Sequence, residues 1–317
     1  MPGVAFNPTR DIPDLAGKVI LITGGAYSSP SRCTAGVGAG TIIELARHNP
    51  AHLLFTGRNA ASAEATISAV HAAAPGVRIS FVQCELAHQG SVKAAAEKPP
   101  LSDLSRLDVL ICCAGIMAKP AALSADGYEI HFATNHLGHA LLTRKLLPLL
   151  ERTADSIPGA DVRIVMVTST AWRGAPPGGI QFDRLRTTQE MALGRWLRYG
   201  QSKLANMLYA RELAKRYGQK ILSFSLTPGV VTTGLVTDLS LLDKALVYVP
   251  NIGRMKTPEE GTHNLLWAIA ARREDIKPGA FYEPVGDLSK MKTKASEDPE
   301  LGNRLWEWTE AEIAKWL

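Results

Sequence analysis

The chain has 317 residues, of which 46% are hydrophobic and 21% charged, with a formal net charge of +5. This composition is ordinary for a globular protein and excludes a low-complexity chain. The apolar runs stop short of the ~20 residues that a membrane span needs, and the N-terminus, "MPGVAFNPTRDIPDLAGK", lacks a signal-peptide pattern. Because the basic residues form no run of five, a nucleic-acid partner is not expected. These observations predict a cytoplasmic protein with no membrane span.

The cysteines indicate neither a disulfide framework nor a metal site. Cys33, Cys84, Cys112 and Cys113 show no Cys-x-x-Cys spacing, and four cysteines are few for a chain of this length. Cys112 and Cys113 lie in an apolar run, so we expect them to be small buried residues.

Strand-like apolar runs alternate with helical patterns from residue 18 to about residue 226. The predicted strands are 18–23, 51–56, 78–84, 107–115, 161–170 and 220–229. The predicted helices are 38–49, 60–75, 91–98, a long segment around 127–155, and 199–218. Strands that are near-continuous Val/Ile/Leu runs, each followed by a helix, indicate a parallel sheet covered on both faces. The right-handed crossover rule then predicts an α/β fold with a doubly wound, mostly parallel, Rossmann-like sheet in a single domain over 1–317.

After residue 230 the pattern weakens, and residues 231–255 are expected to form a cover over the site. A helix at 258–272 and a strand near 279–284 follow. The tail, about 298–317, has an amphipathic helical pattern that places Leu301, Leu305, Trp308 and Ile313 on one face. Its tryptophans suit a membrane surface, but its carboxylates favour docking on the protein's own surface or on a partner subunit, so a homo-oligomer remains an alternative.

Tyr199 and Lys203, in "YGQSK", are spaced i and i+4, which puts a phenol and an ammonium on one helix face. A tyrosine ionises near pH 10, and a neighbouring positive charge lowers its pKa. Such a tyrosine can exchange a proton with a substrate oxygen. Alone, this pair is most often an ordinary helix surface, so its meaning depends on the motifs around it.

Those motifs stand at the ends of the predicted strands. They are "LITGG…GVG" after the first strand, "CCAG" after the fourth, Asn135 in the next helix, Ser169 in "VTSTA", and "TPGVVTT" at 227–233. In order and position they resemble the short-chain dehydrogenase/reductase family over about residues 16–290. "GGIQFDRL" and "YGQSKLANMLYARELAKR" are most similar to its retinol-dehydrogenase-like and WW-domain-oxidoreductase-like members.

The resemblance implies hydride transfer between a nicotinamide and a carbonyl or alcohol substrate. Tyr199 would be the acid or base, and Lys203 would hold the nicotinamide ribose and lower the pKa of the tyrosine. Ser169 would bind the substrate oxygen, and Asn135 would support a water linked to the lysine. Taken singly, Ser169 would be a strand-end cap and Asn135 a solvent-facing helix residue. The resemblance also divides the domain in two. Residues from about 16 to 160 would form a cofactor half, and residues from about 161 to 290 would form a catalytic and substrate half.

Cofactor choice depends on the end of the second strand, where an acidic residue would bind the ribose 2′-hydroxyl of NAD. Gly57 takes that place and Arg58 follows, and an arginine pairs with a 2′-phosphate. NADP(H) is therefore preferred over NAD(H). The resemblance implies further cofactor contacts from these residues: Glu85 and Leu86 near the adenine, Ala114 and Gly115, Tyr199 and Lys203, and Pro228, Gly229, Val231 and Thr233 near the carboxamide and pyrophosphate.

Two departures from the family pattern qualify this prediction. Cys112 and Cys113 replace two asparagines, which removes a brace between strands and is expected to cost stability more than chemistry. Eleven residues separate Gly24 from Gly36, where such a turn usually has about three.

Gly24 would make the tight turn, and Gly36 and Gly38 would let the pyrophosphate approach the helix that follows. If residues 25–35 bulge outward, the phosphates are still reached, and Arg32 or a serine assists. If they fold inward, they fill the groove, and the protein would be a non-catalytic nucleotide sensor or scaffold. The outward arrangement is favoured because the other site residues are present. The substrate is expected to be lipophilic and to lie under residues 232–257, with Trp172 and the 174–195 excursion at its rim.

Overall fold

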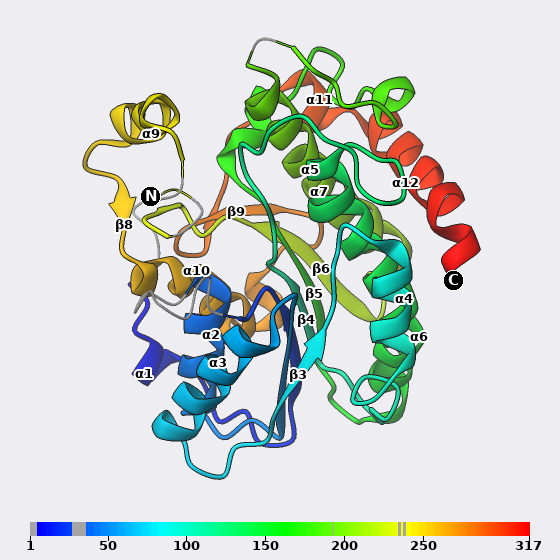
Figure 1. Ribbon diagram of the computed structural model, residues 1–317. Helices are drawn as coiled ribbons and strands as arrows, with labels where there is room; N and C mark the ends of the chain where they lie inside the picture. Colours follow the sequence, from blue (N-terminus) through cyan, green and yellow to red (C-terminus); the bar gives the residue numbers. More distant parts are fainter. Residues whose placement is uncertain (1–4, 27–35, 192, 234–235, 237–238) are drawn as a thin grey trace.

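The computed structural model describes residues 5–26, 36–191, 193–233, 236 and 239–317, and it is built on one eight-stranded sheet with helices on both faces (Figure 1). The strand order is β10-β9-β6-β5-β4-β1-β2-β3. The strands pair in parallel except β10, which is antiparallel to β9. Their bounds are β1 Val19–Thr23, β2 His52–Gly57, β3 Ile79–Gln83, β4 Val109–Cys112, β5 Val162–Val167, β6 Ile221–Leu226, β9 Phe281–Glu283 and β10 Asp287–Leu288. The central order is that of a doubly wound sheet, which confirms the predicted fold class.

Two hydrophobic cores lie on the two sides of this sheet because successive strand residues point to opposite faces. Leu21 and Leu54 belong to the core on the side of α4, α6 and α7, whereas Ile20 and Phe55 belong to the core on the side of α2, α3 and α10. The helices are α1 Pro8–Asp11, α2 Val37–Ala46, α3 Ala60–Ala73, α4 Gln89–Glu97, α5 Ile130–Phe132, α6 Gly138–Ser156, α7 Gly194–Tyr217, α9 Leu241–Tyr248, α10 Pro258–Ala270, α11 Lys294–Glu297 and α12 Pro299–Ile313.

Several predicted bounds differ from the structure at the edge of the sheet that holds the site. Strands β4 and β5 end earlier than the predicted residues 115 and 170, because the chain leaves the sheet there to form site loops. The predicted helix at 127–155 is interrupted by a π-helical turn at Ala133–Leu137. Helix α7 begins at Gly194, before the predicted start at Tyr199. The catalytic candidate Tyr199 therefore lies within the helix rather than at its end.

The expected cover over the site contains ordered elements. Strand β7 (Val230–Val231) pairs in parallel with β8 (Met255–Lys256), and α9 projects beside them, away from the main sheet (Figure 1). Residues 234, 235, 237 and 238 of this cover lie outside the described part of the chain.

The C-terminal helix α12 packs along α7 and α6 (Figure 1, red), which confirms docking on the protein's own surface. Leu301, Leu305 and Ile313 are buried as predicted, but Trp306 is more deeply buried than Trp308. The Trp306 ring stacks on Tyr209 with a centroid separation of 5.2 Å. Among the described residues, no helix is long and apolar enough to span a membrane.

Candidate active site

Tyr199 and Lys203 are buried on one face of α7, at the edge of the sheet where β5 ends. The Lys203 Nζ atom lies 5.9 Å from the centre of the Tyr199 ring. It also donates a hydrogen bond to the carbonyl oxygen of Val167, the last residue of β5, at 3.1 Å. The predicted i and i+4 pair therefore shares a face, and the lysine is held by the end of the neighbouring strand.

The ionisation of this pair differs from the sequence prediction. Burial raises the pKa of Tyr199 to about 12, while its hydrogen bond with Ser169 acts in the lowering direction. Burial also lowers the pKa of Lys203 to about 8. The predicted lowering of the tyrosine pKa by the lysine was thus wrong for the protein alone. The reason is that removing the phenolate from water costs more free energy than its interactions with neighbouring groups provide.

Ser169 follows β5 and begins a 3-10 turn, Thr170–Gly174. Its hydroxyl oxygen accepts a hydrogen bond from the backbone N–H of Ala171 at 3.2 Å. Ser169 is therefore a cap, and it also stands beside Tyr199. Trp172, in the same turn, is only 1% exposed and packs edge-on against Phe281. The prediction that Trp172 forms the rim of the substrate site was wrong, because its ring belongs to the core beneath.

Asn135 lies in the π-helical turn and holds the loop that follows β4. Its side chain accepts from the N–H of Ile116 at 2.8 Å and donates to the carbonyl oxygen of Ile116 at 3.0 Å. It also donates to the Ser202 hydroxyl at 2.9 Å. A Cβ at Gly115 would lie 3.1 Å from Asn135 Oδ1 and 3.4 Å from Lys203 Nζ. The absence of a side chain at residue 115 is what lets these two groups approach the loop.

A hydrogen-bonded brace that the sequence analysis missed lies beside Cys112 and Cys113, where the family pattern has asparagines. The hydroxyl oxygen of Thr23, at the end of β1, accepts from the N–H groups of Cys113 and Ala114 at 2.9 and 3.0 Å. The same hydroxyl bonds His139 Nε2 at 2.8 Å, and His139 Nδ1 donates to the carbonyl oxygen of Asn135 at 2.8 Å. This chain joins β1, the loop after β4 and the π-helical turn. Cys112 is buried as predicted, and Cys113 is half-buried.

The glycine turn after β1 is closely packed. Gly24 has φ +74°, and a Cβ there would lie 2.8 Å from Ala114 Cα. A Cβ at Gly38 would lie 2.6 Å from the carbonyl oxygen of Gly24. Gly36 is the N-cap of α2, so the free N–H groups of the first turn of α2 begin directly after it. Gly25, which the sequence analysis passed over, is equally restricted, since a Cβ would lie 2.3 Å from Ile42 Cδ1.

The centre of the long loop, residues 27–35, lies outside the described residues. This segment includes Arg32, which was predicted to assist cofactor binding, and Cys33.

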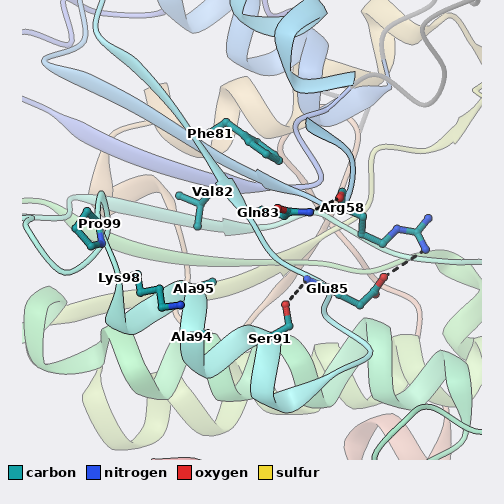
Figure 2. Close-up of a pocket in the computed structure, with 10 residues that line it drawn as sticks. All are labelled: Arg58, Phe81, Val82, Gln83, Glu85, Ser91, Ala94, Ala95, Lys98 and Pro99. Atoms are coloured by element: carbon teal, nitrogen blue, oxygen red, sulfur yellow. Dashed lines mark hydrogen bonds and ion pairs between the residues drawn. The ribbon is translucent and has the colours of Figure 1, made fainter. Parts of the chain in front are cut away.

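Arg58 and Glu85 line a pocket of about 450 Å³ beside β3 and α4, as Figure 2 shows. Arg58 Nη1 lies 3.6 Å from Glu85 Oε2, and the Arg58 side chain is 71% exposed. The carbonyl oxygen of Arg58 accepts from Gln83 Nε2 at 3.1 Å, and the N–H of Glu85 donates to the Ser91 hydroxyl at 3.0 Å. The backbone of Arg58 and Glu85 is therefore held by side chains, while the Arg58 guanidinium is exposed to solvent. Leu86 differs from Arg58 and Glu85, because its side chain is buried in the core.

The last group of candidates follows β6 at the same edge of the sheet as Ser169 and Ala114. Pro228 and Gly229 form the turn, and Gly229 has φ +87°. The Val231 side chain is buried, and a Cβ at Gly261 would meet it at 2.7 Å. Thr233 is partly exposed, with its N–H bonded to the carbonyl oxygen of Val231 at 2.9 Å. Across the described ranges, no three His, Cys, Asp or Glu side chains are grouped to hold a metal ion.

Comparisons with known proteins place this geometry in a family. The family model for short chain dehydrogenases matches residues 18–181. A short-chain dehydrogenase/reductase of Aspergillus calidoustus, drtF, is 36% identical over 314 residues, covering 96% of each chain. Human retinol dehydrogenase 14 is 32% identical over 94% of this chain and 86% of its own. The chain belongs to the short-chain dehydrogenase/reductase family and is an oxidoreductase of that family.

Solved structures show the same fold. An uncharacterised protein of Mycobacterium paratuberculosis has a TM-score of 0.71 at 27% identity, covering 98% of each chain. The NADPH-bound carbonyl reductase from chicken fatty liver has a TM-score of 0.64 at 22% identity, covering 90% of this chain and 97% of its own.

Proposed function

We propose that the protein is an NADP(H)-dependent oxidoreductase that reduces or forms a carbonyl on a lipophilic small molecule, with Tyr199 as the proton-transfer residue. The observation that carries this proposal is the meeting of Ser169, Tyr199 and Lys203, two of them on α7, at the end of β5. Asn135 joins them through the loop after β4.

A nicotinamide cofactor would supply or accept the hydride when bound, and the residues of the chain would transfer the proton. In the reductive direction, the Ser169 hydroxyl binds the substrate oxygen and Tyr199 donates its proton to it. A pKa of about 12 keeps the Tyr199 phenol protonated at neutral pH, which suits the role of acid. The Lys203 ammonium stabilises the phenolate that remains and would hold the nicotinamide ribose.

Arg58 supports the choice of NADP(H), because its exposed guanidinium follows β2 where a carboxylate would select NAD. Its pairing with Glu85 is a surface ion pair, and such pairs contribute little stability. A 2′-phosphate, which presents more charge and a bidentate geometry, would displace that carboxylate. The NADPH in the structure of the carbonyl reductase from chicken fatty liver agrees with this choice.

The surroundings of Tyr199 support a lipophilic substrate. Met117, Ala118 and Val236 form an apolar cluster with the tyrosine ring. Half-buried side chains pack against this cluster from the turn after Ser169, from α7 and from the cover, namely Ala171, Trp196, Leu239, Val247 and Tyr248. Apolar surroundings of the proton donor favour a substrate with little polarity beside its carbonyl.

Calorimetric titration with NADPH and NADH, followed by turnover assays on apolar ketones and aldehydes, tests the proposal. We expect micromolar NADPH binding, weaker NADH binding, and turnover that Tyr199→Phe removes without changing cofactor affinity. Unchanged turnover in Tyr199→Phe would defeat the mechanism. Cofactor binding with no turnover on any substrate would favour the alternative, a nucleotide-sensing or scaffold protein on the same fold.

A further inference from the structure

A buried charged cluster lies beside Tyr199 and is not used by the proposed chemistry. It consists of Glu129, His131 and Arg198, which are 0%, 0% and 3% exposed. Arg198 Nε lies 3.1 Å from Glu129 Oε1, and His131 Nδ1 lies 2.8 Å from the same oxygen. Fully buried charges are costly unless they are paired and hydrogen-bonded. Arg198 is paired with Glu129 by distance, although its Nε makes no hydrogen bond within the described part of the chain. Its two terminal nitrogens donate instead to the backbone carbonyl oxygens of Gln189 and Lys119.

The cluster fixes the backbone of one residue at both of its polar groups. The N–H of Lys119 donates to His131 Nε2 at 3.0 Å. The carbonyl oxygen of Lys119 accepts from Arg198 Nη2 at 3.2 Å. Because His131 Nε2 accepts here, the proton of the neutral imidazole is on Nδ1, where it is donated to Glu129.

Lys119 is the second of two anchors on a single loop. The first is Ile116, whose N–H and carbonyl oxygen are both bonded to the side chain of Asn135. Between the anchors lie Met117 and Ala118, the two residues that pack against Tyr199. Ala118 has φ +50°, a left-handed conformation that is unfavourable for a residue with a Cβ. Such a conformation persists where the surroundings determine it, and here Ile116 and Lys119 on either side of the Met117–Ala118 segment are both held by hydrogen bonds.

We infer that Glu129, His131 and Arg198 are positioning residues that hold the Met117–Ala118 segment against Tyr199 as a wall of the substrate site. This inference rests on the proposed function. Arg198 and Tyr199 are adjacent on α7, and the His131 and Tyr199 rings meet edge to face at 6.4 Å between centroids. One rigid group therefore sets both the proton donor and the wall beside it. The wall determines which face of a prochiral carbonyl turns toward the hydride.

The anchor can be tested without turnover by hydrogen–deuterium exchange of the peptide covering 114–122. Two variants break it in different ways. His131→Leu removes the acceptor for Lys119, and Arg198→Met combined with Glu129→Gln removes the donor without leaving a charge unpaired. We expect faster exchange of this peptide in both variants and unchanged exchange in the sheet. Exchange as slow as in the wild type would overturn the anchor.

The consequence is tested by the ratio of alcohol enantiomers formed from propiophenone and NADPH. Only folded molecules contribute product, so a variant that merely loses stability keeps the wild-type ratio. We expect the ratio to fall about fivefold or more, with Arg198→Lys intermediate. The matched control is Arg163→Met. Arg163 is also 3% exposed and pairs with Asp161, but at the opposite end of β5. The Arg163→Met variant should lose stability and keep the wild-type enantiomer ratio.

An unchanged enantiomer ratio in variants that turn over would overturn the positioning role. A wild-type protein with no turnover on any carbonyl would instead defeat the proposed function, and the exchange measurement would still decide whether the anchor exists.

Discussion

Lys203 Nζ lies 5.9 Å from the centre of the Tyr199 ring and bonds the carbonyl oxygen of Val167, so the ammonium is buried without a carboxylate partner within salt-bridge distance among the described residues. Burial lowers the pKa of Lys203 from its ordinary value of 10.5 to about 8. A lysine that binds its proton less tightly in the folded state than in the unfolded state destabilises the fold wherever both states are charged. The lysine proposed to assist Tyr199 therefore destabilises the fold.

Lys203→Met is expected to stabilise the cofactor-free protein at pH 7 by about 3 kcal/mol while removing turnover. The sign follows from linkage. Below pH 8 both states hold the proton and the full penalty applies. Between pH 8 and 10.5 the folded state releases it first, so wild-type stability rises with pH and the advantage of the variant shrinks.

Urea unfolding of both proteins at pH 7 and pH 9.5, without cofactor, measures this difference. Lys215→Met is the control, because Lys215 lies on an exposed part of the same helix. A Lys203→Met variant no more stable than the wild type at pH 7 would contradict the prediction.

Arg58→Gln should weaken NADPH binding by about 10- to 100-fold and leave NADH binding nearly unchanged, because only NADPH carries the 2′-phosphate. Glu85→Gln should instead strengthen NADPH binding. It removes the carboxylate that lies 3.6 Å from the guanidinium and would compete with the 2′-phosphate. Calorimetry with both cofactors measures the two effects. An equal loss of NADPH and NADH affinity in Arg58→Gln would show that the arginine does not discriminate between them.

The strand–helix alternation was predictable because buried parallel strands have a distinctive composition, and the i and i+4 spacing of Tyr199 and Lys203 predicts a shared face. The π-helical turn was not predictable in the same way. Its extra residue is held by tertiary bonds from Asn135 to Ile116 and Ser202, which no local periodicity encodes.

Two other features could be recognised only from the three-dimensional structure. The brace from Thr23 to His139 joins residues 116 positions apart in the sequence. The pKa of Tyr199 depends on how much surrounding protein excludes water, whereas the sequence shows only the neighbouring charge.

Gly38→Ala should sharply reduce NADPH affinity and lower the melting temperature. A Cβ would lie 2.6 Å from the carbonyl oxygen of Gly24, so the glycine turn, which is proposed to face the phosphates, must move. Gly40→Ala, further along the same helix, is the matched control, because its Cβ would meet a methyl group of Thr262 at 2.9 Å rather than backbone. Titration calorimetry and thermal unfolding of both variants separate the effect of a clash with backbone from that of a clash with a side chain. Wild-type affinity in Gly38→Ala would mean that the glycine turn is not part of the cofactor site.

Trp306→Ala should destabilise the fold by about 3–5 kcal/mol, since it removes a large buried side chain. The ring is 8% exposed, stacks on Tyr209 at 5.2 Å and lies under the Arg216 guanidinium, whose central carbon is 4.4 Å from the ring centroid. These contacts join α12 to α7 far along the helix from Tyr199, so kcat of the remaining folded enzyme should be unchanged. Denaturant unfolding and active-site-normalised turnover measure the two effects, with the exposed neighbour Glu307→Ala as control. A loss of kcat with stability intact would show that the tail acts on the site directly.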